Sequence, residues 1–131
     1  INEENPEFSA ILLYPEEGNS GAKYVSDIYA LELDANLVVL GACQTGLGSV
    51  YKGEGIIGFT RAFIYAGTSN LATSLWKVND QPTAYLMVDF YEQIRQGFDY
   101  SEALRRAKLK LIESPRFASP VNWAAFTLTG R

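Results

Sequence analysis

Histidine is absent from the 131 residues, cysteine occurs once, and no apolar run approaches the length of a membrane span. A nucleophilic cysteine, serine or threonine usually takes histidine as its base, so these residues alone lack the commonest acid–base partner. The same shortage excludes zinc sites built on histidine or on several cysteines, and we expect neither a metal nor another cofactor. A transmembrane helix needs about 20 apolar residues, so we expect no contact with a membrane.

The net charge and the single cysteine limit the cellular compartment and the classes of partner that we expect. One cysteine permits no internal disulfide, which favours a reducing, cytoplasmic location. The net charge is -4, whereas nucleic-acid-binding domains usually present a clustered basic face, so we expect no nucleic-acid partner. The basic stretch over residues 105–110 has helical spacing, and we interpret it as a solvated helix face rather than a binding patch. The chain starts with Ile1 in an acidic, polar segment, which predicts that a signal peptide is absent and that an upstream part is missing.

Apolar runs and turn-forming residues alternate with segments of helical periodicity. The run over 37–42 lacks the alternation of a half-exposed strand and is typical of a parallel strand covered on both faces. Strands are expected over 8–14, 23–25, 37–42, 70–76 and 123–129, and helices over 27–31, 56–66, from Asp80 to Gly97 and from Ser101 to Pro115. The N-caps are expected at Ser26, Asp80 and Ser101, and a stop at Gly67. The apolar faces of the last two helices are expected to consist of Leu86, Val88, Phe90, Tyr91, Ile94, Ala103, Leu104, Ala107, Leu111 and Ile112. This order predicts one α/β domain over residues 1–131, with a mostly parallel sheet and helices on both faces.

Cys43 directly follows the apolar run over 37–42 and precedes a glycine-rich loop. Active sites of open α/β sheets gather at the carboxyl ends of the strands, and unpaired backbone N–H groups there can lower the pKa of a thiol. The alternative is a small, buried core cysteine, a common fate of this residue. Spacing alone leaves both interpretations open.

The glycines around Cys43 also resemble phosphate-binding loops. Residues 41–46 carry the first two glycines of a P-loop, but Leu47 and Gly48 replace its lysine and hydroxyl residue. Residues 53–58 match the dinucleotide pattern formally without following a strand directly, and Glu54 would repel a pyrophosphate. Glycine is favoured in tight turns and where a loop leads into a helix, and these roles account for the glycines better than nucleotide binding does.

Four further side chains have two interpretations each. Asp80 is either a helix cap or a carboxylate that faces a cleft, and the two roles are compatible. Glu54 is either a solvated loop charge or a substrate contact. Trp76 and Trp123 suit packing in the core or at its rim better than a ligand platform.

The segment Leu40-Gly41-Ala42-Cys43-Gln44-Thr45-Gly46 resembles the nucleophile motif of CHAT domains, relatives of caspases and separases that often stand beside tetratricopeptide repeats. The likeness runs from about Asn5 to Gly130. Its further motifs follow in order: Gly53-Glu54-Gly55, Gly58, Arg61-Ala62-Phe63, Ala66-Gly67, Ser74-Leu75-Trp76-Lys77-Val78, Asp80, Phe90-Tyr91, Ala103-Leu104 and Trp123-Ala124-Ala125-Phe126.

The resemblance implies a caspase-like three-layer α/β/α sandwich, truncated at its N-terminal side, with Cys43 as the nucleophile. The family's histidine base is expected upstream of this chain, so the chain alone is expected to be inactive. The segment over 74–77 is similar to the caspase strand that pairs with substrate backbone. Gly41 and Asp80 then become candidate walls of the substrate pocket, Asp80 favouring a basic residue before the cut, with Ser74, Trp76 and Glu54 as further candidate substrate contacts.

Two functions follow from the resemblance. The first is a fragment of a cysteine endopeptidase that acts on a peptide or protein substrate, in a parent chain with a tetratricopeptide-repeat region. The alternative is an inactive pseudopeptidase that serves as a peptide- or protein-binding module. Losing a core strand would also expose a sheet edge, which predicts either a marginally stable fragment or a homodimer that covers the edge.

Overall fold

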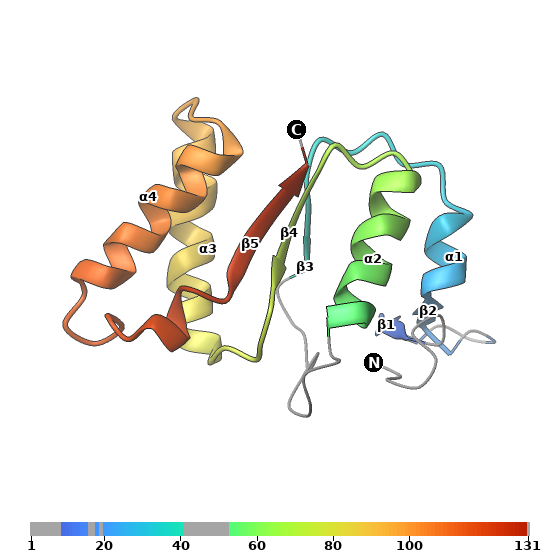
Figure 1. The fold of residues 1–131 in the computed structure, drawn as a ribbon, viewed down its shortest axis with the longest axis horizontal. Coiled ribbons are helices and arrows are strands. Elements are labelled where there is room, and N and C mark those ends of the chain that lie inside the picture. The colour runs from blue at the N-terminus through green and yellow to red at the C-terminus, as the bar shows by residue number, and fades with distance from the viewer. Residues whose placement is uncertain (1–8, 16–17, 19, 41–52, 131) are drawn as a thin grey trace. The chain divides into compact units, whose positions relative to one another are not determined.

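The computed structural model describes residues 9–15, 18, 20–40 and 53–130 (Figure 1). These residues form two compact units, which we describe separately. The first unit takes in the described residues up to Val39, then 53–71 and 129–130; the second takes in Leu40 and 72–128.

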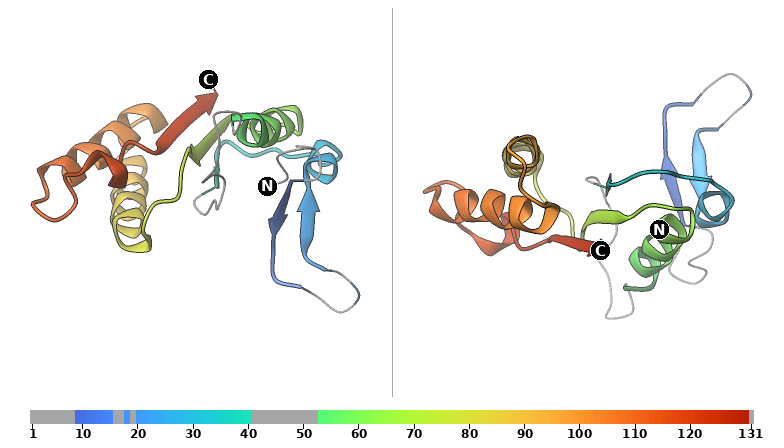
Figure 2. Two further views of the ribbon diagram at one scale, coloured as in Figure 1. Left: turned by 60° about the horizontal axis from the view of Figure 1, so that its bottom comes forward. Right: turned by 90° about the horizontal axis from the view of Figure 1, so that it is seen from above.

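The first unit opens with a hairpin of β1 (Ala10–Leu12) and β2 (Ala22–Tyr24). The strands pair antiparallel, with Ala10 opposite Tyr24, and lie side by side in both views of Figure 2. Helix α1 (Val25–Tyr29) follows at once. The expected cap at Ser26 is wrong, because the carboxylate of Asp27 accepts the backbone N–H of Tyr24 at 2.9 Å and the helix begins at Val25.

Helix α2 (Gly53–Tyr65) packs against α1 through an apolar face. Its buried residues repeat at helical spacing, and with two side chains of α1 they form the core of the unit: Phe59, Ala62, Phe63, Ala66, Val25 and Ile28. Gly67 ends the helix as expected, with φ +108°, and a Cβ there would collide with the carbonyl of Leu33.

A three-stranded sheet has the order β3 (Val38–Leu40), β4 (Asn70–Ser74) and β5 (Phe126–Gly130). Strands β3 and β4 are parallel, since Ala35 and Thr68 form a parallel bridge just before them. Strand β5 runs antiparallel to β4, because Thr73 lies opposite Thr127 while Leu75 bonds to Ala125, so partner numbers fall along one strand as they rise along the other (Figure 1). The α/β class is confirmed, and the described three-stranded sheet has one parallel and one antiparallel pair, so a mostly parallel sheet stays a prediction. The three-layer sandwich, its truncation and the homodimer stay predictions.

The second unit is built on α3 (Asp80–Arg95) and α4 (Tyr100–Glu113), which pack against each other. Their shared core, with the start of β5, consists of Leu86, Phe90, Ala103, Leu104, Ala107, Leu111, Ala125 and Phe126. Three expected apolar contacts are wrong, since Val88 is 69% exposed, Tyr91 51% and Ile112 38%. A 3₁₀ turn over Pro120–Asn122 leads from α4 toward β5.

The caps of these two helices also differ from the expected ones. The N-cap of α3 is Asn79 and that of α4 is Asp99, one and two residues before Asp80 and Ser101. Asp99 accepts the backbone N–H of Glu102 at 2.8 Å and the hydroxyl of Ser101 at 3.0 Å, and these bonds lower its pKa. Gly97, with φ +93°, follows the end of α3 as expected.

The basic stretch over 105–110 is a helix face, as expected. The carboxylate of Glu102 accepts hydrogen bonds from Arg105 and Arg106, each at 2.7 Å, which lowers the pKa of Glu102 to about 2. Lys110 meets Asp89 on α3. The positive charges therefore serve contacts within the unit.

Candidate functional site

The sequence-predicted nucleophile, Cys43, and the pocket candidate Gly41 lie outside the described residues. Glu54 belongs to the first turn of α2, but its side chain is likewise outside the described part. Cys43 follows Leu40, the last residue of β3, by three positions. Its role and those of Gly41 and Glu54 therefore stay predictions.

The structure does describe the edge of the sheet at which β3, the strand before Cys43, ends. Strands β3 and β4 are parallel, so they end at one edge, after Leu40 and after Ser74. This is the edge at which α/β proteins place their ligands.

Ser74 and Trp76 are held at this edge by bonds within the second unit. Ser74 is buried, and the next residue, Leu75, donates its backbone N–H to the carbonyl of Ala125 at 2.9 Å. The indole N–H of Trp76, half-buried, donates to the carbonyl of Val121 at 3.1 Å. These bonds fix the segment that leaves β4 against the approach to β5.

Trp123 makes a similar bond, from its indole N–H to the carbonyl of Ala118 at 3.0 Å. Both tryptophans therefore brace the turn between α4 and β5, which agrees with packing at the rim of the core.

Asp80 is the first residue of α3 and is exposed. It is not the cap, because Asn79 occupies that position, and the carbonyl of Asn79 accepts both the backbone N–H and the hydroxyl of Thr83. A carboxylate in the first turn is still favoured by the helix dipole. Of the two interpretations of Asp80, the one that remains is an exposed carboxylate six residues after the end of β4.

Sequence reasoning missed Lys108, which lies on α4 and is half-buried. Its ammonium group donates to the carbonyl of Phe126 at 2.6 Å and so ties the helix to β5. Burial lowers the pKa of Lys108. A lysine inside a basic stretch carries no sequence signal that distinguishes it from its solvated neighbours.

The described residues hold no group of three or more histidine, cysteine, aspartate or glutamate side chains placed to bind a metal ion. None of the helices in the described part is long and apolar enough to cross a membrane.

The CHAT domain family model matches residues 1–131. This chain belongs to the CHAT domain family. Human tetratricopeptide repeat protein 28 is 36% identical over 105 residues, which cover 80% of the CHAT chain but 4% of that protein. The mouse protein of the same name is 34% identical with the same coverage. The chain thus spans a small part of these relatives, and no solved structure matches it.

Proposed function

We propose that this CHAT chain is the cysteine-bearing part of a caspase-like cysteine endopeptidase, with Cys43 as the nucleophile. One observation carries the proposal. The parallel pairing of β3 and β4 brings the end of β3, three residues before Cys43, and the start of the segment after Ser74 to the same edge of the sheet. A nucleophile and a substrate-binding segment need such a common edge.

The chemistry follows from the residue types. The Cys43 thiolate attacks the carbonyl carbon of a peptide bond, and its backbone N–H is one donor to the oxyanion. A histidine takes the thiol proton and returns it to the leaving amine, after which water hydrolyses the acyl-enzyme. These 131 residues contain no histidine, so the base comes from another part of the protein.

The segment after β4 is the proposed grip on the substrate. The N–H of Leu75 is already bonded to Ala125, so substrate backbone pairs with the remaining main-chain groups of Ser74 and Trp76. Asp80, exposed at the start of α3, would favour a basic residue before the cut, and Gly41 and Glu54 would complete the walls.

The relatives' name supports a tetratricopeptide-repeat region in the parent protein. A cytoplasmic location and a three-layer sandwich completed by further strands belong to the same proposal. Repeats of this kind bind other proteins along a concave surface, so they would deliver a protein substrate rather than a free peptide.

An electrophilic peptide tests the proposal. The full-length protein is treated with a peptidyl acyloxymethyl ketone that carries arginine next to the ketone, and labelled peptides are identified by mass spectrometry. We expect labelling at Cys43, its loss in Cys43→Ala, and weaker labelling in Asp80→Asn. The matched control Asp89→Asn changes a carboxylate on the same helix that meets Lys110 instead, and should leave labelling unchanged. An unlabelled Cys43 in a protein that carries the histidine contradicts the proposal.

The absence of histidine from the chain favours one alternative, a binding module whose groove holds a peptide without cutting it. On this alternative, Cys43→Ala leaves partner binding intact. Loss of binding in a variant that keeps its circular dichroism spectrum and melting temperature would rule it out.

A further inference from the structure

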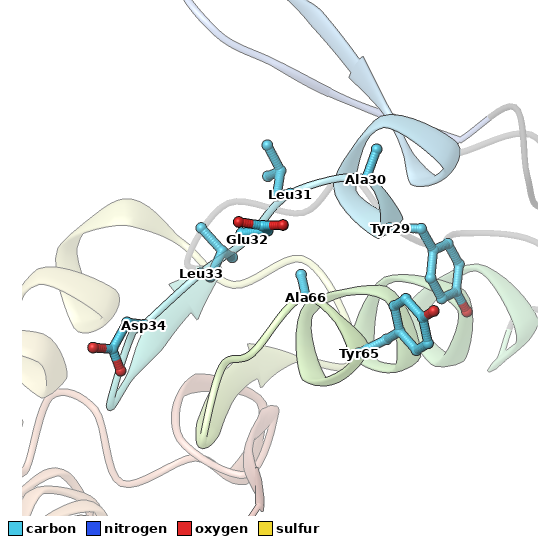
Figure 3. A pocket seen from close by; sticks show the side chains of 8 residues that line it. All are labelled: Tyr29, Ala30, Leu31, Glu32, Leu33, Asp34, Tyr65 and Ala66. Atoms are coloured by element: carbon cyan, nitrogen blue, oxygen red, sulfur yellow. The ribbon is translucent and has the colours of Figure 1, made fainter.

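An open hollow of about 660 Å³ lies in the first unit, where the end of α2 meets the segment after α1. Tyr29 and Tyr65 stand together at one end of it, with ring centroids 5.5 Å apart in an edge-to-face arrangement. Figure 3 shows Asp34 at the other end and Glu32 between them. The hollow therefore combines two aromatic rings with two carboxylates.

The hollow is built by the backbone rather than by loose side chains. The N–H of Leu33 donates to the carbonyl of Ala66 at 2.6 Å, which pins the segment over 30–34 to the end of α2. The next residue is Gly67, whose φ of +108° and close approach to the carbonyl of Leu33 leave no room for a Cβ. This geometry makes the site pre-formed.

Among the described residues that line the hollow, the charged side chains, Glu32 and Asp34, are both negative. Helix α2 ends here, and the C-terminal end of a helix dipole attracts cations, yet its last turn carries no basic residue. The basic side chains described in this unit, Lys23 and Arg61, do not line the hollow. Within the described residues, Glu32 and Asp34 also make no ion pair.

We infer that this hollow binds an arginine side chain presented by a partner protein. A guanidinium stacks on tyrosine rings and pairs with a carboxylate, which the ammonium of lysine does less well. The hollow is too open to enclose a small free cation, and Leu31 and Tyr65 beside it are 44% and 77% exposed. A protein surface around the arginine would cover that apolar area.

The hollow shares no lining residue with the proposed peptidase site. Asp34 precedes β3 and Cys43 follows it, so the two lie beyond opposite ends of the strand in the sequence. The inference therefore stands or falls independently of the nucleophile.

Fluorescence anisotropy of the full-length protein with a labelled Gly-Ser-Arg-Ser-Gly peptide tests the inference. The same peptide with citrulline, which has the shape of arginine without its charge, is the ligand control. We expect the arginine peptide to bind more tightly than the citrulline peptide, and Glu32→Gln to weaken binding about threefold. Tyr65→Leu should weaken it by a similar factor. The variant Glu113→Gln removes an exposed carboxylate far along the chain and should change nothing.

Several results would overturn the inference: no binding of the arginine peptide, equal binding of both peptides, or equal effects of Glu32→Gln and Glu113→Gln. Spermidine binding as tightly as the arginine peptide would assign the hollow to a free cation. Sedimentation showing a dimer that Tyr65→Leu dissociates would assign it to a second copy of the chain. Glu32 and Tyr65 are exposed, so both can be changed without disturbing the core. Circular dichroism checks that each variant is folded.

Discussion

The two units use their surface charges differently. In the second unit the carboxylate of Glu102 is held by two arginines, and both α3 and α4 carry a basic residue in the last turn, Arg95 and Lys110. Cations at that position interact favourably with the helix dipole. These charges are therefore satisfied within the unit.

In the first unit the corresponding position is empty of cations. Helix α2 ends without a basic residue in its last turn, next to Glu32 and Asp34. The difference indicates that a change of Glu102 should affect stability, whereas a change of Glu32 or Asp34 should affect binding. The predictions below test this contrast.

The largest effect is expected in the core of the second unit. Phe90 is fully buried between α3 and α4, so Phe90→Ala should lower the free energy of unfolding by about 3–5 kcal/mol. Val88, on the same helix but 69% exposed, is the control. Val88→Ala should change the free energy of unfolding by less than about 0.5 kcal/mol. Urea titration followed by circular dichroism measures both. Equal effects would contradict the described packing of α3.

A smaller effect is expected at the glycine that ends α2. Gly67→Ala introduces both an unfavourable φ and a collision with the Leu33 carbonyl, and should cost roughly 2–3 kcal/mol. Gly97 has a similar φ, but a Cβ there meets nothing within 4 Å, so Gly97→Ala should cost only about 1 kcal/mol. Gly67→Ala should also weaken the arginine peptide, whereas Gly97→Ala should not. The same cost at both glycines would mean that the segment before β3 is not pinned.

The caps of α3 and α4 give the next contrast. Asp99 makes a side-chain cap bond and Asn79 does not. Asp99→Ala should therefore cost about 1 kcal/mol and Asn79→Ala less, by thermal melting. A larger loss from Asn79→Ala would show that α3 depends on a cap bond that the structure lacks.

The smallest effect is a dependence on pH. The pKa of Glu102 is lowered to about 2 in the folded chain from its ordinary 4.5, so its contribution is present above pH 4.5 and is lost as the pH falls toward 2. The stability difference between the wild type and Glu102→Gln should shrink over that window. Because the group is exposed, the difference should be small and should fall with added salt.

The strands at 10–12, 38–40 and 70–74 and the stop at Gly67 were predictable, because apolar runs and glycines act locally. The caps were misplaced since Asn79, Asp80, Asp99 and Ser101 are all good capping residues, and only backbone geometry distinguishes them.

The helix faces show a different limit. Val88 and Tyr91 fit the apolar period of α3 but are exposed, because a pattern of apolar residues does not say which of two adjacent stripes is buried. The antiparallel direction of β5 was not predictable either, since a short strand after a helix can pair in both directions. Among the candidate site residues, Ser74 ends β4, inside the strand expected over 70–76, while the roles of Ser74, Trp76 and Cys43 stay predictions.

The most direct test of the central claim is a crystal structure of the full-length protein after reaction with the arginine ketone. The account predicts a thioether from the Cys43 Sγ, with the inhibitor backbone paired to the segment over Ser74–Trp76 at the edge where β3 and β4 end. A peptide bound elsewhere, or a Cys43 side chain enclosed in the core away from that edge, would contradict it.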